Sequence, residues 1–151
     1  MAPIVAALLR KRGSIELPSF GMSMYPLIQE GDVSRFVTTD AAELAVGDVC
    51  LFVNAYGIMT GHRLVSIGSE DGDDVFLFRG DTSFIPDDPV PAGAILGKWT
   101  GVRSGSGWKP ESGFRSRALR LLVLRIPLTR KVLRKLGNWS MSRKPLYRST
   151  S

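Results

Sequence analysis

Residues 21–32 read GMSMYPLIQEGD and separate two short runs of strand-forming residues, SIELPSF at 14–20 and DVSRFV at 32–37. Runs rich in Val, Ile and Phe that are bounded by Gly, Pro and Asp are typical of strands divided by turns. In the middle of this connection Ser23 stands between two methionines. Its hydroxyl either caps a short helix in a packed corner or lies at the floor of an apolar groove.

The same β-like pattern continues beyond this stretch to about residue 103. Four further candidate strands follow: DVCLFV (48–53), IMTGHRLVSI (58–67), VFLFR (75–79) and AILGKWTGV (94–102). Between them, GSEDGDD at 68–74 predicts an exposed hairpin loop, and PDDPVPAG at 86–93 is too rich in proline for regular structure. The pattern predicts a mainly β body made of several short strands.

The two ends of the chain depart from this pattern. Residues 3–12 predict a short helix, while SGSGWKPESG at 104–113 has the composition of a linker. Beyond the linker, Leu, Ile and Val mix with Arg and Lys at near-helical spacing, and we expect Pro127 to divide this segment into two helices. The predicted organisation is an N-terminal helix or arm (1–14), a β domain (15–103), a linker (104–113) and a basic amphipathic helical tail (114–151).

Charge is distributed unevenly between the body and the tail. Residues 1–111 carry 9 Lys and Arg against 14 Asp and Glu, a net charge of −5, whereas residues 112–151 carry 11 Lys and Arg and no acid. The amphipathic part, residues 114–139, either packs its leucines on the body or docks on an anionic membrane surface. The pattern disfavours nucleic acid as a partner, and it does not indicate an oligomeric state.

Two features bear on the compartment. No stretch reaches the ~18–20 apolar residues that cross a bilayer. In MAPIVAALLRKRG the basic residues follow the apolar run, whereas they precede it in a secretory signal. We expect a cytoplasmic protein, with a peripheral position at the inner face of the membrane as the further possibility.

Cysteine and histidine usage restricts the chemistry. The single Cys50 lies within an apolar run, which predicts a buried core residue and excludes an intrachain disulfide or a cysteine-based metal site. The single histidine, His62, is either a packed strand residue or a general base, because imidazole exchanges protons near neutral pH. One serine, one imidazole and the acids Asp81, Asp87 and Asp88 form the inventory of a Ser-His-Asp relay.

The order of the motifs resembles a known family. GMSMYPLIQEGD, LAVGDVCLFV, GHRLVSI, FRGDTSFIPDD and AILGKWTGV look like the successive boxes of signal peptidase I. They are similar to the serine/histidine branch of the endoplasmic reticulum, archaea and sporulating bacteria, over about residues 15–102. The resemblance implies a signal peptidase/LexA-like β fold and a serine endopeptidase that cleaves a leader or signal-like peptide with no cofactor and no metal. His62 falls where the related lysine-dependent peptidases carry their base, which disfavours a Ser-Lys dyad.

The resemblance also implies a role for each site residue. Ser23 matches the nucleophile, His62 the general base, and Asp87 the aspartate that orients the histidine. Asp81 matches the earlier aspartate of the Gly-Asp box, either as a member of the relay or as a turn carboxylate. Because Asp88 directly follows Asp87, the identity of the third member stays open.

The residues around Ser23 are implied to bind the substrate. Backbone N–H groups near Met22 would hold the oxyanion, and Gly21 replaces a serine that assists in many signal peptidases. Met22, Met24 and Tyr25 would form the floor and walls of a groove for an extended peptide with small side chains. Two other functions remain open: a catalytically silent peptide-binding module of the same fold, and a LexA-like self-cleaving regulator that the basic tail alone supports.

Overall fold

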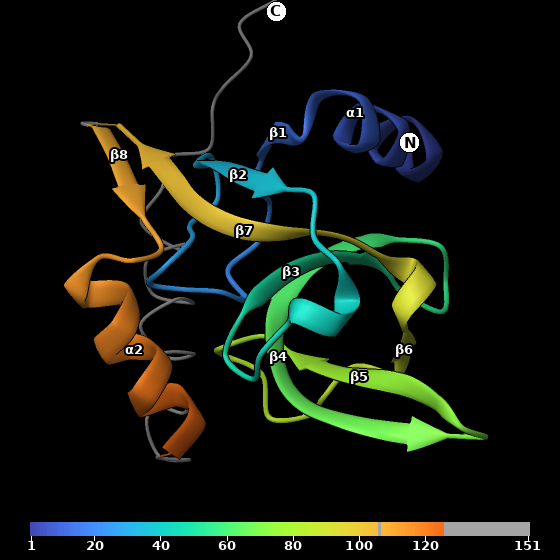
Figure 1. The fold of residues 1–151 in the computed structure, drawn as a ribbon. Helices are drawn as coiled ribbons and strands as arrows, with labels where there is room; N and C mark the ends of the chain where they lie inside the picture. The colour runs from blue at the N-terminus through green and yellow to red at the C-terminus, as the bar shows by residue number, and fades with distance from the viewer. Residues whose placement is uncertain (106, 126–151) are drawn as a thin grey trace, which may run out of the picture.

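Eight strands form one antiparallel sheet in this computed structural model, which describes residues 1–105 and 107–125. The strands are β1 (Ser14–Pro18), β2 (Val33–Val37), β3 (Val49–Val53), β4 (Met59–Glu70), β5 (Asp73–Arg79), β6 (Val90–Pro91), β7 (Ile95–Ser104) and β8 (Gly107–Pro110). Their spatial order is β1-β2-β7-β3-β4-β5-β6, and β8 pairs with β7. Figure 1 shows that the sheet curls into a half-barrel. The prediction of a mainly β body is therefore confirmed.

The predicted N-terminal helix is present as α1 (Ala2–Arg12). Pro3 lies in its first turn, where a missing N–H costs nothing. At the other end Gly13 adopts a left-handed φ of 74° and its N–H donates to the Leu9 carbonyl, as expected of a glycine that ends a helix. Val5 and Leu9 bury the inner face of the helix against the sheet.

The hairpin predicted between HRLVSI and VFLFR is present, but its loop is shorter than expected. Strand β4 runs to Glu70 and β5 begins at Asp73, so only two residues connect them. These residues, Asp71 and Gly72, have φ values of 53° and 88°. Positive φ at both positions suits the two-residue turns that match strand twist, and Asp-Gly is a preferred pair there.

Two short strands lie where the sequence predicts irregular structure. In the proline-rich segment, Val90 pairs with Phe76 of β5 and is buried, while Pro91 lies in the edge strand β6, where its missing N–H is tolerated. In the expected linker, β8 pairs back onto β7 from Gly107 to Pro110. Part of the expected linker, Gly107–Pro110, therefore extends the sheet.

Two apolar clusters form the core, one on each face of β3. One joins α1, β2 and β7 to the connection between β1 and β2, through Met24 and Ile28. The other lies around the stacked rings of Phe52 and Phe78, whose centroids are 4.3 Å apart. The predicted burial of Cys50 is confirmed, and this burial raises the pKa of its thiol to about 12.

The start of the predicted basic tail forms α2 (Phe114–Arg125). Val123 is buried, whereas Leu121 is 56% exposed, so only part of the apolar face contacts the body. Pro127 and the rest of the tail, up to residue 151, lie outside the described residues. Within the described part, neither helix is long and apolar enough to cross a bilayer.

Candidate active site

Ser23 lies in the turn that connects β1 to β2. Two backbone hydrogen bonds join the ends of this connection: the Ser19 N–H donates to the Asp32 carbonyl, and the Gly31 N–H donates to the Ser19 carbonyl. Met24 directly follows the serine and is buried in the core. The buried neighbour fixes the turn, and Ser23 itself is half-buried and lines a cavity rather than capping a helix.

The hydroxyl of Ser23 meets the only imidazole of the chain. His62 is carried by β4, where it pairs in register with Cys50 of β3. Its Nε2 lies 3.0 Å from Ser23 Oγ, a hydrogen-bonding distance. The ring of Phe52 packs against it in a T-shaped arrangement, with 6.3 Å between the centroids, so an apolar side chain contacts the imidazole.

Asp87 meets the other ring nitrogen of His62. Its Oδ2 lies 2.7 Å from His62 Nδ1. The segment between β5 and β6 carries this aspartate, and its backbone N–H donates to the Phe78 carbonyl at 2.8 Å. A carboxylate at Nδ1 favours the tautomer with the proton on that nitrogen, which leaves Nε2 free to accept the serine proton.

The sequence left two roles open for Asp81, a member of the relay or a turn carboxylate. The contacts of Asp81 fit the second role. It is fully buried and forms two 2.7 Å hydrogen bonds with Arg63, which follows His62 on β4. The same guanidinium donates to the Gly47 carbonyl at 2.9 Å. Asp81 is therefore a structural carboxylate and not the partner of His62. Asp88 is exposed and has no hydrogen bond or ion pair among the described residues.

The residues on either side of Asp81 lie directly against Ser23, and Gly80 also lies against His62. A Cβ added at Gly80 would lie 3.0 Å from Ser23 Cβ and 3.2 Å from His62 Nε2. Thr82 donates its backbone N–H to the Ser23 carbonyl at 3.0 Å. Asp81 lies between Gly80 and Thr82 and is held by its ion pair with Arg63. This ion pair therefore keeps the loop that carries all three residues in contact with the turn that contains Ser23. The sequence alone suggested a turn at Gly80-Asp81, and its contact with Ser23 becomes visible only in three dimensions.

The backbone around Ser23 is open on its N–H side. The N–H groups of Met22 and Ser23 donate no hydrogen bond to any described residue. Gly21 has a φ of 75°, in the left-handed region that favours glycine, and nothing lies within 4 Å of a Cβ built there. These two N–H groups are thus available to an oxygen outside the chain.

An apolar cavity of about 290 Å³ adjoins the serine. It is lined by Gly21, Ser23 and Met24, as expected, together with apolar side chains from β1, β2, β3 and β4, among them Leu17, Phe36, Leu51 and Met59. Phe20 stands at its edge with 81% of its surface exposed. Met22 and Tyr25, which the sequence placed in the groove walls, are half-buried and do not line this cavity.

Two further observations define the chemistry that this site can support. Cys50, opposite His62, keeps its proton at neutral pH because burial raises its thiol pKa to about 12, so the serine is the available nucleophile. Among residues 1–105 and 107–125, no cluster of three or more His, Cys, Asp or Glu side chains could hold a metal ion.

Comparison with known proteins assigns no family. The chain matches no protein-family model. It also matches no curated protein.

Proposed function

We propose that the chain is a serine endopeptidase that uses Ser23, His62 and Asp87. The observation that carries this proposal is the continuous contact from Ser23 Oγ to His62 Nε2 and from His62 Nδ1 to Asp87. In this mechanism His62 accepts the serine proton as the hydroxyl attacks a peptide carbonyl, and later gives the proton to the leaving amine. Asp87 holds the ring in place and stabilises its cation.

The oxyanion that forms on the attacked carbonyl needs hydrogen-bond donors. The free N–H groups of Met22 and Ser23 are suited to this task, and backbone donors fixed before the reaction need little reorganisation. With glycine at position 21, the oxyanion site relies on the backbone. We therefore expect slower turnover than in an enzyme with an added hydroxyl donor.

An extended peptide is the substrate that suits the surroundings of the site. Strand β1 is an edge of the described sheet and leads from Ser14 through Leu17 to the cavity beside Ser23. A peptide that pairs with such an edge places alternate side chains on one face. Side chains on that face would enter the apolar cavity, and the scissile carbonyl would face Ser23.

The signal peptidase/LexA-like fold belongs to the same proposal. It is supported by the position of the serine in a turn between two antiparallel strands, by the histidine on a later strand, and by the two aspartates that follow β5. We propose a leader-like peptide as the substrate.

A peptide library digested with purified protein and read by mass spectrometry tests the proposal. The wild type and Ser66→Ala, which changes an exposed serine of β4, should give the same cleavage products. Ser23→Ala and His62→Ala should give none, while circular dichroism shows them folded. Persistent cleavage by either variant would refute the relay. Peptide binding without cleavage by the wild type would favour the silent module.

A further inference from the structure

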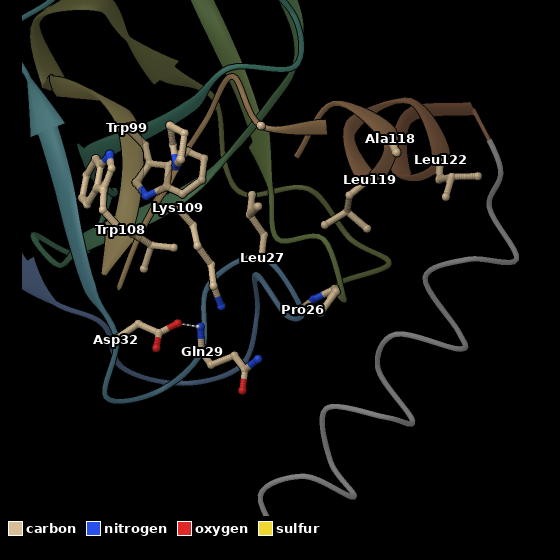
Figure 2. A pocket seen from close by; sticks show the side chains of 13 residues that line it. Pro26, Leu27, Gln29, Asp32, Trp99, Trp108, Lys109, Ala118, Leu119 and Leu122 are labelled. Atoms are coloured by element: carbon tan, nitrogen blue, oxygen red, sulfur yellow. Dashed lines mark hydrogen bonds between the residues drawn. The ribbon is translucent and has the colours of Figure 1, made fainter. Parts of the chain in front are cut away.

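The segment that carries Ser23 contributes to two different cavities. Leu27 lines the larger one, of about 630 Å³, which Figure 2 shows between this segment and α2. Met24 lines the smaller one, of about 290 Å³, which also reaches Ser23. Neither Ser23 nor His62 lines the larger cavity. Of the two, the smaller cavity is therefore the one that a side chain of a peptide attacked at Ser23 can enter.

The smaller cavity lies on the acyl side of the proposed cleavage site. His62 gives its proton to the leaving amine in the proposed mechanism, so the leaving half of the substrate passes beside the imidazole. His62 does not line the cavity, whereas Gly61 does, as expected of strand neighbours that face opposite sides of a sheet. The side chain that enters the cavity therefore belongs to the residue that supplies the attacked carbonyl, immediately before the cleaved bond.

The walls of this cavity are apolar. They include the side chains of Leu17, Met24, Ile28, Phe36, Leu51 and Met59. Besides Ser23, two serines line the cavity, and these two, Ser19 and Ser34, are hydrogen-bonded to each other at 3.0 Å. No charged side chain lines the cavity among the residues that the structure describes. A charged side chain would lose its hydration there without gaining a partner.

The cavity is also larger than a small side chain requires. An apolar cavity of about 150 Å³ already admits benzene, and this cavity has about 290 Å³. An alanine methyl group would leave most of this space without contacts, whereas leucine or phenylalanine would bury more apolar surface against the walls. The resemblance to signal peptidase I implies substrates with small side chains, and this volume departs from that expectation.

Gly61 keeps part of this space open. A Cβ built there would meet one side-chain atom within 4 Å, Phe36 Cζ at 3.8 Å, which is ordinary van der Waals contact. Because Phe36 lines the same cavity, a side chain at position 61 would begin beside the cavity wall without meeting backbone. Substitution of Gly61 therefore narrows the cavity at a defined place.

We propose that this cavity makes the chain selective for a large apolar residue, such as leucine, methionine or phenylalanine, immediately before the cleaved bond. The selectivity comes from burial of that side chain against the cavity walls, and the missing side chain of Gly61 leaves room for it. This inference rests on the proposed peptidase activity and names the substrate class of the same site.

Peptide libraries that are degenerate except for a fixed central residue test the selectivity. The fixed residue is Ala, Leu, Phe or Asp, and mass spectrometry measures the rate of cleavage directly after it. For the wild type, we expect cleavage after Leu and Phe to exceed cleavage after Ala by ~10–100-fold, because more apolar surface is buried. Cleavage after Asp should be absent. Cleavage after Ala that equals or exceeds cleavage after Leu would overturn this proposal and leave the relay intact.

Gly61→Val tests the cavity through a ratio of two rates, because damage to the relay lowers both rates alike. The ratio of cleavage after Leu to cleavage after Ala should fall at least ~10-fold. Gly68→Val is the matched control, since Gly68 lies on the same strand, does not line the cavity, and would place a Cβ 3.7 Å from Val75. An unchanged ratio in folded Gly61→Val would overturn the proposal.

Met59→Ala changes the cavity in the opposite direction. It removes a lining side chain, so the ratio of cleavage after Phe to cleavage after Leu should rise ~3-fold or more. This test holds even where Gly61→Val does not fold. A wild-type ratio in folded Met59→Ala would overturn the proposal.

Binding to an inactive variant separates the cavity from the chemistry. In Ser23→Ala, acetyl-Ala-Ala-Ala-Leu-amide should shift the methyl resonances of Met24 and Met59, which line the cavity. The all-alanine analogue should bind at least ~10-fold more weakly. If the wild type cleaves no library but this preference is found, the peptidase proposal fails and the preference of the cavity stands. If neither cleavage nor preference is found, both proposals fail.

Discussion

Substitution of Gly80 by alanine is expected to separate the proposed nucleophile from its base. The added Cβ would lie 3.0 Å from both the Cβ and the carbonyl oxygen of Ser23, and 3.2 Å from His62 Nε2. Carbon atoms prefer separations of about 3.5–4.0 Å, so the neighbours must move by roughly 0.5 Å. A shift of that size would lengthen the 3.0 Å contact between Ser23 and His62 beyond hydrogen-bonding distance.

The size of the effect follows from what that contact contributes. General-base assistance is worth ~10²–10⁴-fold in rate, and a partial loss should slow the reaction of Ser23 with a fluorophosphonate by about 10- to 100-fold. Overpacking should also lower the free energy of unfolding by about 1–3 kcal/mol, measured in urea.

Gly93→Ala is the matched control for this substitution. Nothing lies within 4 Å of a Cβ at Gly93, so it should react at the wild-type rate. A folded Gly80→Ala protein that also reacts at the wild-type rate would refute the geometry proposed for Ser23 and His62.

Four further predictions address the relay and the fold. Asp87→Asn should lower cleavage on the order of 10³-fold, because the wrong histidine tautomer is favoured, and equal cleavage rates would contradict this. Asp81→Asn should lower the free energy of unfolding by about 3–5 kcal/mol by leaving Arg63 buried and unpaired, with exposed Asp88→Asn as a neutral control in urea unfolding. Burial raises the pKa of Glu111, so its ionisation opposes folding as the pH rises. Glu111→Gln should therefore raise the melting temperature at pH 7.5 but not at pH 4. A higher melting temperature at both pH values would refute ionisation of Glu111 as the cause. Cys50, whose pKa is raised to about 12 by burial, should resist iodoacetamide at pH 8 until urea unfolds the chain, and rapid alkylation of the native protein would contradict its burial.

The strands could be predicted because strand-forming runs and turn residues are local signals. The two short strands were missed for opposite reasons. In the expected linker, glycine and serine concealed a hairpin, and β8 is held by pairing with β7 and by the Arg35 guanidinium 4.5 Å from the Trp108 ring. In the proline-rich segment, one buried valine pairs with β5.

The site was predictable in its members but not in all of its contacts. Ser23 and His62 were identified by their motifs, and the structure brings them together. The choice between Asp81 and Asp87 depended on which carboxylate met Arg63 and which met the imidazole, a long-range relation that spacing does not encode. The sequence gives no sign that Gly80 lies against the serine and the histidine, where the absence of its side chain allows the two to touch.

Activation of Ser23 by His62 can be tested by mass-spectrometric mapping of the residue that a fluorophosphonate modifies in the native protein. We expect one adduct per chain, on Ser23, that is lost in His62→Gln and in unfolded wild type. An adduct on another serine, or equal labelling of Ser23 in His62→Gln, would contradict activation of this hydroxyl by the histidine.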